Sequence, residues 1–295
     1  MDTSSYFIDG KCLFGCYPTY DGLIELEANG VVLFVDLTTE QEKVRLNVYQ
    51  TTKRYLSFPI KDRYIPINLH EYTKFIIQLC NEINNLKDGE KVYIHCKGGH
   101  GRSGIVVACI LSYMNNISGE ESILLTTKYH SNRKTMRDKW RCIGSPQTNK
   151  QKEFIIRMFK PIFLTNVNIH NTYYILNNNS LYNIKIDSYN YKNINRYYYS
   201  LKYPEVKNRI KKCNSLHEFK KVLENINSTT GEFNSIEFFR KMLKKKIKCK
   251  RVIDVLIRTF LRPIVYVEDE IDLGKIWTEL RNDYLLHIDN CAKQQ

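Results

Sequence analysis

A cysteine and an arginine six residues apart are the residues of this sequence whose types and spacing best support chemistry. They occur in the segment Val92-Tyr93-Ile94-His95-Cys96-Lys97-Gly98-Gly99-His100-Gly101-Arg102-Ser103-Gly104. Its first apolar residues predict a buried strand, and the apolar run Ile105–Met114 that follows predicts a buried helix. The glycines between them let the backbone curl so that successive N–H groups converge on one point. A loop of this kind at a helix N-terminus predicts a binding site for a phosphate or a similar oxyanion.

The side chains of this segment suit phosphate chemistry. Converging amides, the helix dipole and Arg102 should favour the thiolate form of Cys96, which is the nucleophilic form. The planar fork of Arg102 can bind two phosphate oxygens, and Ser103 can donate its hydroxyl to the sulfur when a phosphocysteine is hydrolysed. We expect His95 to orient the loop by hydrogen bonding. The residues expected to surround the phosphate are Lys97, Gly98, Gly99, His100, Gly101 and Arg102.

The spacing is specific to one of the nine cysteines, because none of the other eight has an arginine six residues later. The alternative, an inert cysteine buried in a tight turn, does not account for the arginine and the glycines. His95-Cys96-x5-Arg102-Ser103 resembles the signature of the cysteine-dependent protein tyrosine phosphatases, particularly the dual-specificity type. Two more segments resemble core strands of that family, Leu13-Phe14-Gly15-Cys16-Tyr17-Pro18 and Val35-Asp36-Leu37-Thr38.

The resemblance covers roughly residues 8–160 and carries implications for fold and activity. It implies an α/β domain in which a mostly parallel sheet is flanked by helices. It also implies hydrolysis of phosphomonoesters, on tyrosine or with dual specificity, through a phosphocysteine and without a metal or cofactor. The adaptor alternative, a phosphate-binding module with little turnover, does not require the nucleophile that this sequence contains.

The resemblance further implies a general acid and a residue that positions water. Asp62, in Phe58-Pro59-Ile60-Lys61-Asp62-Arg63-Tyr64-Ile65-Pro66, resembles the acid that protonates the leaving oxygen. The alternative for Asp62 is an ordinary surface aspartate in a turn. Gln147, in Gln147-Thr148-x-x-Gln151, resembles the loop that positions water, and the same residues also match a helix cap.

The substrate class stays open between three alternatives. Phosphorylated protein is the first. The loop also resembles that of the phosphoinositide phosphatases, which carry basic residues at the places matched by Lys97 and His100, although His100 should be only partly charged at pH 7. A third class of relatives removes phosphates from RNA 5′ ends, but those enzymes generally lack a general acid, and Asp62 argues against that class.

The elements that must position these residues alternate between strand-like and helix-like patterns from Lys11 to Met158. Short apolar runs predict buried strands at 31–37, 92–94 and, more weakly, 55–60. Amphipathic or apolar patterns predict helices at 21–28, 69–86 and 105–114. Ser118 and Thr148 predict the caps of two further helices, and Pro161 should end the last one. Strands separated by helices indicate an α/β domain with a largely parallel sheet.

Length and composition limit the classes of protein. The chain has 295 residues, 43% apolar and 26% charged, which suggests one or two globular domains and excludes a wholly disordered protein. Cys12 and Cys16 lack a second pair of ligands nearby, so no metal site is expected. We see no signal peptide and no apolar stretch as long as the ~20 residues of a membrane span. We therefore expect a cytoplasmic protein with reduced thiols, or one of a host cell or virion if the protein is viral.

The charge lies mainly in the C-terminal half. The first 150 residues have a net charge of +3 and the remainder +11. The densest run, Arg240–Arg251, holds eight Lys or Arg in twelve residues and no acid. It predicts either a face that binds anionic partners such as RNA or lipid, or a solvated helix face with Met242, Leu243 and Ile247 turned inward.

The C-terminal half also resembles a second family, and we expect two domains. The segments Ile184-x-Ile186-Asp187-Ser188-Tyr189, Tyr197–Tyr203, Val255–Thr259 and Leu273–Arg281 resemble the NADAR N-glycosidases. Asn195 replaces the expected glutamate, and the Asp-x-x-Trp-Gly segment is missing between Glu270 and Leu273. We expect a phosphatase domain at 1–162 and, at 166–295, a basic, mainly helical, degenerate NADAR-like domain for binding or regulation. The sequence does not predict the oligomeric state.

Overall fold

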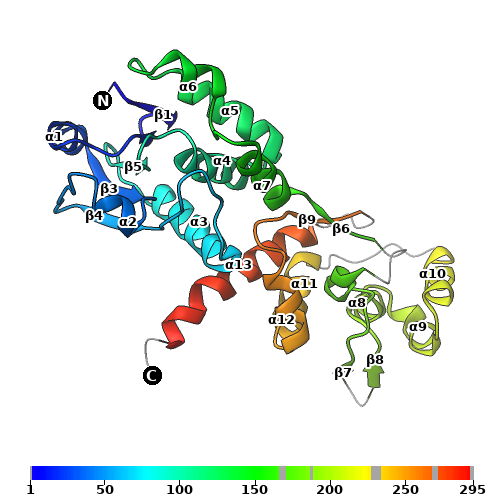
Figure 1. Cartoon of the computed structure of the whole chain (residues 1–295). Coiled ribbons are helices and arrows are strands. Elements are labelled where there is room, and N and C mark those ends of the chain that lie inside the picture. The colour runs from blue at the N-terminus through cyan, green and yellow to red at the C-terminus, as the bar shows by residue number, and fades with distance from the viewer. Residues whose placement is uncertain (1, 166–170, 187–188, 227–233, 268–271, 293–295) are drawn as a thin grey trace. The chain divides into compact units, whose positions relative to one another are not determined.

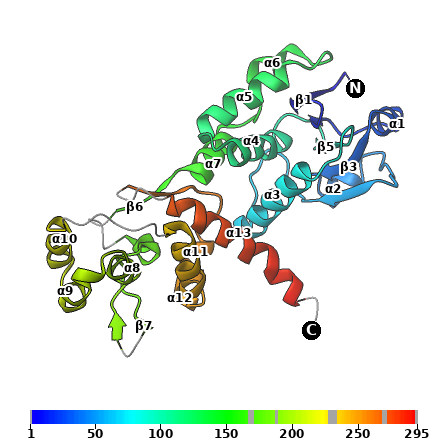
Figure 2. The ribbon, with the colours of Figure 1, turned by 180° about the vertical axis from the view of Figure 1, so that it is seen from behind.

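The chain forms two compact units in a computed structural model that describes residues 2–165, 171–186, 189–226, 234–267 and 272–292. Unit 1 comprises Met1–Lys160 together with Phe260–Arg262. Unit 2 comprises Pro161–Thr259 and Pro263–Gln295. Figures 1 and 2 show the ribbon from opposite sides, and each unit is described by itself below.

The centre of unit 1 is a five-stranded sheet with the strand order β1-β2-β5-β3-β4. Its strands are β1 (Ser4–Ile8), β2 (Cys12–Gly15), β3 (Val31–Asp36), β4 (Arg54–Ser57) and β5 (Lys91–His95). β1 pairs antiparallel with β2, and the other three pairings are parallel. The expected mostly parallel sheet is therefore confirmed. β5 lies in the middle of the sheet, so the residue that follows it, Cys96, is held at the carboxyl end of the best-supported strand.

Helices cover this sheet on both faces (Figure 2). The helices of unit 1 are α1 (Tyr20–Ala28), α2 (Glu40–Lys43), α3 (Leu69–Asn84), α4 (Arg102–Asn115), α5 (Gly119–Ser131), α6 (Asp138–Ile143) and α7 (Asn149–Phe159). Leu23 and Leu26 of α1 pack with Tyr93 of β5 on one face. Val92 and Ile94 alternate to the other face, where α4 packs against β2 and β5. α4 is buried from its first residue through Ser112, and α3, α5 and α7 pack around it.

The strands and helices expected in the N-terminal half are confirmed, apart from one strand and one cap. β4 is shorter than the expected 55–60 and is an exposed edge strand. Beyond it, the Phe58 and Ile60 amides donate to the carbonyls of Asp36, the last residue of β3, and Leu37. Ser118 caps α5 through the Glu121 amide, without the reciprocal bond of a capping box. Thr148 and Gln151 form the complete box at α7, which ends before Lys160 and Pro161, as expected.

Unit 2 is mainly helical, as expected. Its helices are η1 (Thr172–Leu176), α8 (Ile194–Lys202), η2 (Pro204–Val206), α9 (Lys207–Lys212), α10 (Leu216–Glu224), α11 (Ser235–Lys246), α12 (Lys250–Ile257) and α13 (Leu273–Ala292). Two small sheets join them, a parallel pair of β6 (Ile162–Leu164) and β9 (Ile264–Tyr266), and an antiparallel pair of β7 (Ile184–Ile186) and β8 (Tyr189–Tyr191). Trp277 of α13 is fully buried in the core, and its indole N–H donates to the carbonyl of Leu176.

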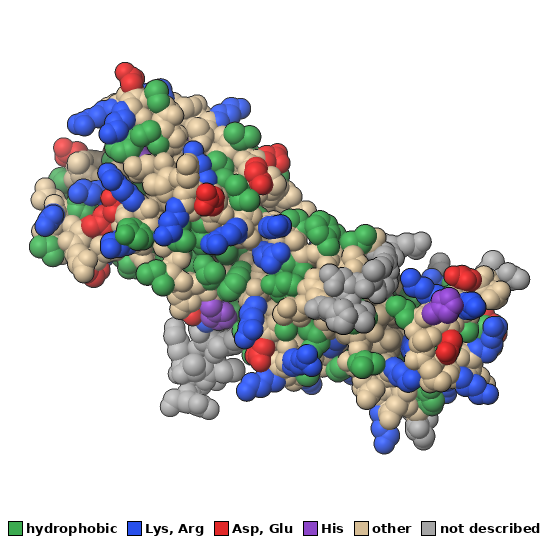
Figure 3. Space-filling view, turned by 45° about the vertical axis from the view of Figure 1, so that its right-hand side comes forward, with side chains coloured by type: hydrophobic (Ala, Val, Ile, Leu, Met, Phe, Trp, Pro, Cys, Tyr) green, Lys and Arg blue, Asp and Glu red, His purple; other side chains and the backbone are tan. Residues whose placement is uncertain are grey.

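The basic run of unit 2 occupies the end of α11 and the start of α12. Met242 and Leu243 are buried and Ile247 packs partly against the same core, which confirms the expected inward face. One residue of the run is not solvated: Lys246 is fully buried, contrary to the expectation of an exposed charge. Lys and Arg side chains are spread over the visible surface and do not gather in a single patch (Figure 3).

The NADAR resemblance stays a prediction. Asn195, at the place of the expected glutamate, is buried, and its side-chain amide donates to Asn179 Oδ1. Asp187, Ser188 and Glu270 lie outside the described residues. No helix among the residues that the structure describes has the length and apolar character needed to cross a membrane.

Candidate active site

The loop between β5 and α4 folds back over the sulfur of Cys96. Cys96 is only 3% exposed, and its Sγ accepts a hydrogen bond from the Gly99 amide at 3.3 Å. Ser103, in the first turn of α4, places its hydroxyl 3.7 Å from the same sulfur. Both polar groups therefore point at the atom that the sequence identifies as the nucleophile.

Glycine is required at position 99 for two reasons. Its φ of +73° lies in the left-handed region, and a Cβ there would come within 2.4 Å of the Gly15 backbone. The end of β2 therefore packs directly against the loop, and the Tyr17 amide extends this contact by donating to the Lys97 carbonyl at 3.1 Å. Lys97 and Gly98 are exposed on the outer side of the loop.

Arg102 is buried and held by two carboxylates. Its two terminal nitrogens donate to the two oxygens of Glu42 at 2.6 and 2.9 Å, and one of them also donates to the Ile60 carbonyl at 3.0 Å. The other terminal nitrogen lies 3.0 Å from Asp62 Oδ1. Burial acts to lower the pKa of Arg102, but Glu42, Cys96 and Asp62 outweigh it and raise that pKa. The guanidinium is thus fixed in its charged form beside the loop.

The structure places Asp62 at the site, with its carboxylate against Arg102. A turn, in which the Tyr64 amide donates to the Lys61 carbonyl, presents Asp62 to the loop. Arg63 has a φ of 62°, which reverses the chain directly after the aspartate. The Asp62 side chain is 57% exposed, so it contacts both Arg102 and solvent. This is the position that an acid for a leaving group needs, although the role itself stays a prediction.

Gln147 and Gln151 lie beside the last glycine of the loop. A Cβ at Gly101 would come within 3.0 Å of the Gln151 amide and 3.4 Å of Gln147 Cβ. Gln151 completes the cap of α7 and also donates to the Tyr64 carbonyl at 3.2 Å. The segment therefore caps α7 and also lies beside the loop. The helix-cap interpretation and the water-positioning interpretation are both compatible with this arrangement.

His95 is a buried and neutral support for the loop. It is fully buried, its Nε2 lies 2.7 Å from the Tyr49 hydroxyl, and the Tyr17 ring packs edge-on against it. Burial lowers the pKa of His95 to about 4, although Asp36 opposes the shift. A ring that is neutral at pH 7 agrees with an orienting role and not with proton transfer.

His100 differs from the partly charged residue that the sequence predicts. Its ring stacks on Trp140 of α6, with centroids 4.6 Å apart, and its Nδ1 lies 2.8 Å from Nε2 of His130. Burial and then the charge of Arg133 lower the pKa of His100 to about 4. The prediction of partial charge is therefore wrong, since the sequence does not show the packing that removes the ring from water. Of the two loop positions expected to be basic, only Lys97 is left to carry a charge.

Glu42 is the site residue that sequence reasoning missed. Thr39 and Glu42 have the spacing of a capping box, which the structure forms at the start of α2. That pattern explains a helix start, but it does not reveal a contact with an arginine sixty residues later. Among the residues that the structure describes, no three His, Cys, Asp or Glu side chains are grouped in a way that could hold a metal ion.

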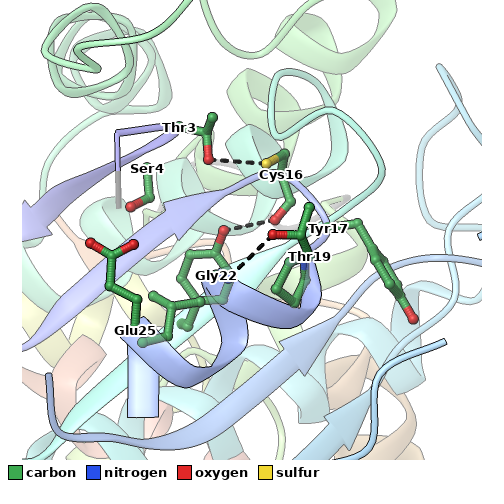
Figure 4. A pocket seen from close by; sticks show the side chains of 10 residues that line it. Thr3, Ser4, Cys16, Tyr17, Thr19, Gly22 and Glu25 are labelled. Atoms are coloured by element: carbon green, nitrogen blue, oxygen red, sulfur yellow. Dashed lines mark hydrogen bonds between the residues drawn. The ribbon is translucent and has the colours of Figure 1, made fainter. Parts of the chain in front are cut away.

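A pocket of about 150 Å³ lies close to the loop but outside it (Figure 4). It is lined by Thr3 and the start of β1, by the segment between β2 and α1 that includes Cys16, by Glu25 and other residues of α1, and by Tyr93 of β5. The Cys16 thiol donates to Thr3 Oγ1 at 3.1 Å, and the Tyr93 hydroxyl donates to the Cys16 carbonyl at 2.7 Å. Since the lining contains neither Cys96 nor Arg102, this pocket does not hold the reacting atoms.

Comparisons with known proteins find similarities over about half of the chain. A family model described as "Swiss Army Knife protein, DSP-PTPase phosphatase domain" matches residues 16–155. "Putative tyrosine phosphatase 067L" of Invertebrate iridescent virus 3 is 38% identical over 56% of this chain and 68% of its own length. "Putative tyrosine phosphatase 197R" of Invertebrate iridescent virus 6 is 44% identical over 51% of this chain, and the match spans only 52% of that relative. The crystal structure of a mutant form of Tk-PTP is 27% identical, covers 52% of this chain and 93% of its own, and has a TM-score of 0.41.

Proposed function

The chain belongs to the family of cysteine-dependent tyrosine and dual-specificity phosphatases, and from this membership we propose that it hydrolyses phosphomonoesters of proteins through a phosphocysteine at Cys96. One observation carries the proposal. A single short loop brings together the Cys96 sulfur, a backbone amide directed at it and a charged arginine at the start of a buried helix.

The first step transfers the phosphoryl group to sulfur. The Cys96 thiolate attacks phosphorus, an S–P bond forms, and the bond from phosphorus to the leaving oxygen breaks. Loop amides and Arg102 stabilise the charge on the other three oxygens. A phosphate that binds Arg102 competes with the Asp62 carboxylate for the same guanidinium nitrogen. Asp62, released from this ion pair and protonated, gives its proton to the leaving oxygen.

The second step returns the enzyme to its starting state. A water molecule attacks phosphorus, Asp62 takes its proton, and the S–P bond breaks with release of inorganic phosphate and the thiolate. The Ser103 hydroxyl, 3.7 Å from Sγ, donates to the departing sulfur. Gln147 lies beside Gly101 and is assigned to positioning the water.

The electrostatics of the loop favour a phosphorylated protein over a phosphoinositide. An inositol headgroup carries several phosphates, and the loop offers one side-chain cation, Lys97, in addition to the reacting Arg102, because His100 is neutral at pH 7. The position of Asp62 next to Arg102 supports an acid-assisted reaction, which argues against the RNA 5′-phosphatase alternative. A thiolate nucleophile needs a reducing compartment, so we assign the reaction to the cytoplasm.

A colorimetric assay with an aryl phosphate tests the chemistry. The full chain should release the phenol, vanadate should inhibit the release, and Cys96→Ser should abolish turnover while still binding vanadate or phosphate. Full activity in Cys96→Ser would refute the scheme. An inactive wild-type chain that binds phosphate would instead support the adaptor alternative.

A panel of phosphopeptides, phosphoinositides and 5′-triphosphorylated RNA then tests the substrate class. The largest kcat/KM is expected on the phosphopeptides. A larger kcat/KM on the phosphoinositides or on the RNA would mean that this class is the substrate and phosphorylated protein is not.

A further inference from the structure

Arg133 is a second buried arginine of unit 1, and it lacks a counter-charge. It follows α5, is 2% exposed, and donates from Nη2 to the Phe14 carbonyl at 3.1 Å. Its guanidinium carbon lies 4.5 Å from the centre of the Phe14 ring, and its buried Nε has no hydrogen-bond partner. In the described part of the chain no carboxylate forms an ion pair with it. A buried charge left in this state is unfavourable unless another group compensates it.

Two sets of contacts connect Arg133 to the phosphate loop. Phe14, which accepts its hydrogen bond, pairs in the sheet with Ile94, two residues before Cys96. The next residue of β2, Gly15, packs against Gly99. On the other side, the Arg133 amide donates to the His130 carbonyl at 3.4 Å, and the His130 ring bonds to His100 of the loop. The guanidinium thus lies beneath the loop, on the side of β2.

The electrostatics of this region identify the compensating group. Burial lowers the pKa of Arg133 to about 10, and Tyr93, Cys96 and Cys16 oppose that shift. The pKa of Tyr93 is itself raised well above its ordinary value by burial, so its hydroxyl is neutral. The charge of Arg133 adds to burial in lowering the pKa of His130 to about 3, and the nearby charge of Arg141 acts in the same direction. Of these neighbours, the nucleophile Cys96 is the one whose chemistry requires a negative charge.

Arg102 alone does not supply this compensation, because two carboxylates surround it. Glu42 and Asp62 both lie within 3.0 Å of its nitrogens, so the three side chains together carry a net charge of about −1 when both acids are ionised. Lys97 is exposed and its charge is screened by solvent. A cation without a carboxylate, held in a low-dielectric interior, acts more strongly on the sulfur than an exposed lysine does.

We propose that Arg133 is a positioning residue whose buried charge stabilises the Cys96 thiolate from beneath the phosphate loop. The proposal deepens the proposed function and rests on it for its catalytic meaning. Arg133 touches no substrate. It acts through the sulfur, whereas Arg102 binds the transferred phosphoryl group.

The test measures the ionisation of Cys96 directly. The full chain is treated with iodoacetamide at a series of pH values, and mass spectrometry follows the alkylation of the peptide that contains Cys96. The peptide with the exposed Cys142 serves as an internal reference for the reagent. Arg133→Met should raise the half-point of Cys96 alkylation by about 1 pH unit, because a buried charge acts on the thiolate with less screening than a charge in water.

Two further variants separate charge from packing. Arg133→Lys keeps a cation and should restore the half-point. Arg141→Gln removes an exposed arginine of the neighbouring helix, which bonds to the carbonyls of Ser131 and Arg133, and should not shift it. Circular dichroism checks that each variant is folded. If Arg133→Met is unfolded, Arg133→Gln is measured in trimethylamine N-oxide, which favours the compact state, and the same shift is expected.

An unshifted half-point in a folded neutral variant overturns the proposal, and so does a shift in Arg133→Lys as large as that in Arg133→Met. The readout does not need turnover. A wild-type chain that is alkylated at low pH but hydrolyses no phosphomonoester would therefore refute the proposed function and leave the role of Arg133 standing.

Discussion

Units 1 and 2 both contain buried basic side chains, and Arg102 of unit 1 and Lys246 of unit 2 have their charges compensated in opposite ways. Arg102 of unit 1 is 1% exposed and bonds to both oxygens of Glu42, with Asp62 at its other side. Lys246 of unit 2 is fully buried, and its amine donates to neutral oxygens, the Asn177 carbonyl and the Ser180 hydroxyl, each at 2.8 Å. The carboxylates raise the pKa of Arg102, whereas burial lowers that of Lys246 to about 7.

The difference shows which of the two buried side chains is charged at neutral pH and can bind an anion. Arg102 keeps its proton at any physiological pH, so its guanidinium is charged whenever a phosphate displaces Asp62 from it. Lys246 is close to neutral at the same pH, because no carboxylate in the described part of the chain supports its charge. The four experiments below test this contrast, from the largest expected effect to the smallest.

Arg102→Lys should have the largest effect, a loss of about 10³-fold in kcat/KM on an aryl phosphate. A lysine offers one point charge and cannot bind Glu42 and two phosphate oxygens at once. Steady-state kinetics measure the loss, and circular dichroism checks the fold. A loss below tenfold would show that a charge alone is sufficient at this position.

Asp62→Asn should lower kcat by about 10²-fold, because the amide accepts the hydrogen bond of Arg102 but has no proton for the leaving oxygen. Steady-state kinetics on an aryl phosphate measure the loss, and an unchanged kcat removes Asp62 from the role.

Glu42→Gln should lower kcat/KM about tenfold and reduce the melting temperature of unit 1 by a few degrees. The neutral amide no longer balances the buried guanidinium, which then depends on Asp62 and the Ile60 carbonyl. Kinetics and a thermal melt measure the two effects, and Glu40→Gln, an exposed carboxylate of the same helix, is the matched control. Equal effects of both substitutions would mean that the contact with Arg102 is unimportant.

Lys246→Met should have the smallest effect on phosphatase activity, and its effect is seen in the pH dependence of the stability of unit 2. The folded pKa of about 7 lies below the ordinary value of 10.5, so the unfolded chain binds more protons between these values. The penalty for burying the charge is complete below about pH 7 and is relieved as the pH rises. The free energy of unfolding should therefore rise by up to about 1.4 kcal/mol per pH unit above pH 7, and the methionine variant should lose this slope.

The two tryptophans make this measurement specific to unit 2. Trp277 is buried in unit 2 and Trp140 belongs to unit 1, so urea unfolding in a Trp140→Phe background reports on unit 2 alone. Lys245→Met, which replaces an exposed lysine of the same helix, should keep the slope. A wild-type chain without the slope would mean that Lys246 is charged and compensated when folded.

Local patterns were sufficient for the central strands and the longer helices of unit 1 and for the loop, but they did not predict β1, α2 or α6. The spacing of Cys96 and Arg102, the glycines and the apolar flanks predicted a strand, a tight loop and a buried helix, because each depends on interactions between near neighbours in the chain. The same reasoning predicted a longer β4, over residues 55–60. The length of this strand depends on its pairing with β3 at the edge of the sheet, which the sequence does not show. Asp62 was placed at the site only through the family resemblance.

Patterns among residues close together in the sequence could not reveal the charge contacts between distant residues. The sequence by itself determined the proposed nucleophile, the arginine proposed to bind phosphate and the alternation that builds the sheet, because these are set by residue type and by spacing within a few turns of chain. Only the tertiary structure decided that Glu42 holds Arg102, that His100 is neutral against Trp140 and His130, and that Arg133 and Lys246 are buried without carboxylates. Charge states depend on burial and on partners far away in the sequence, and both exist only once the chain is folded.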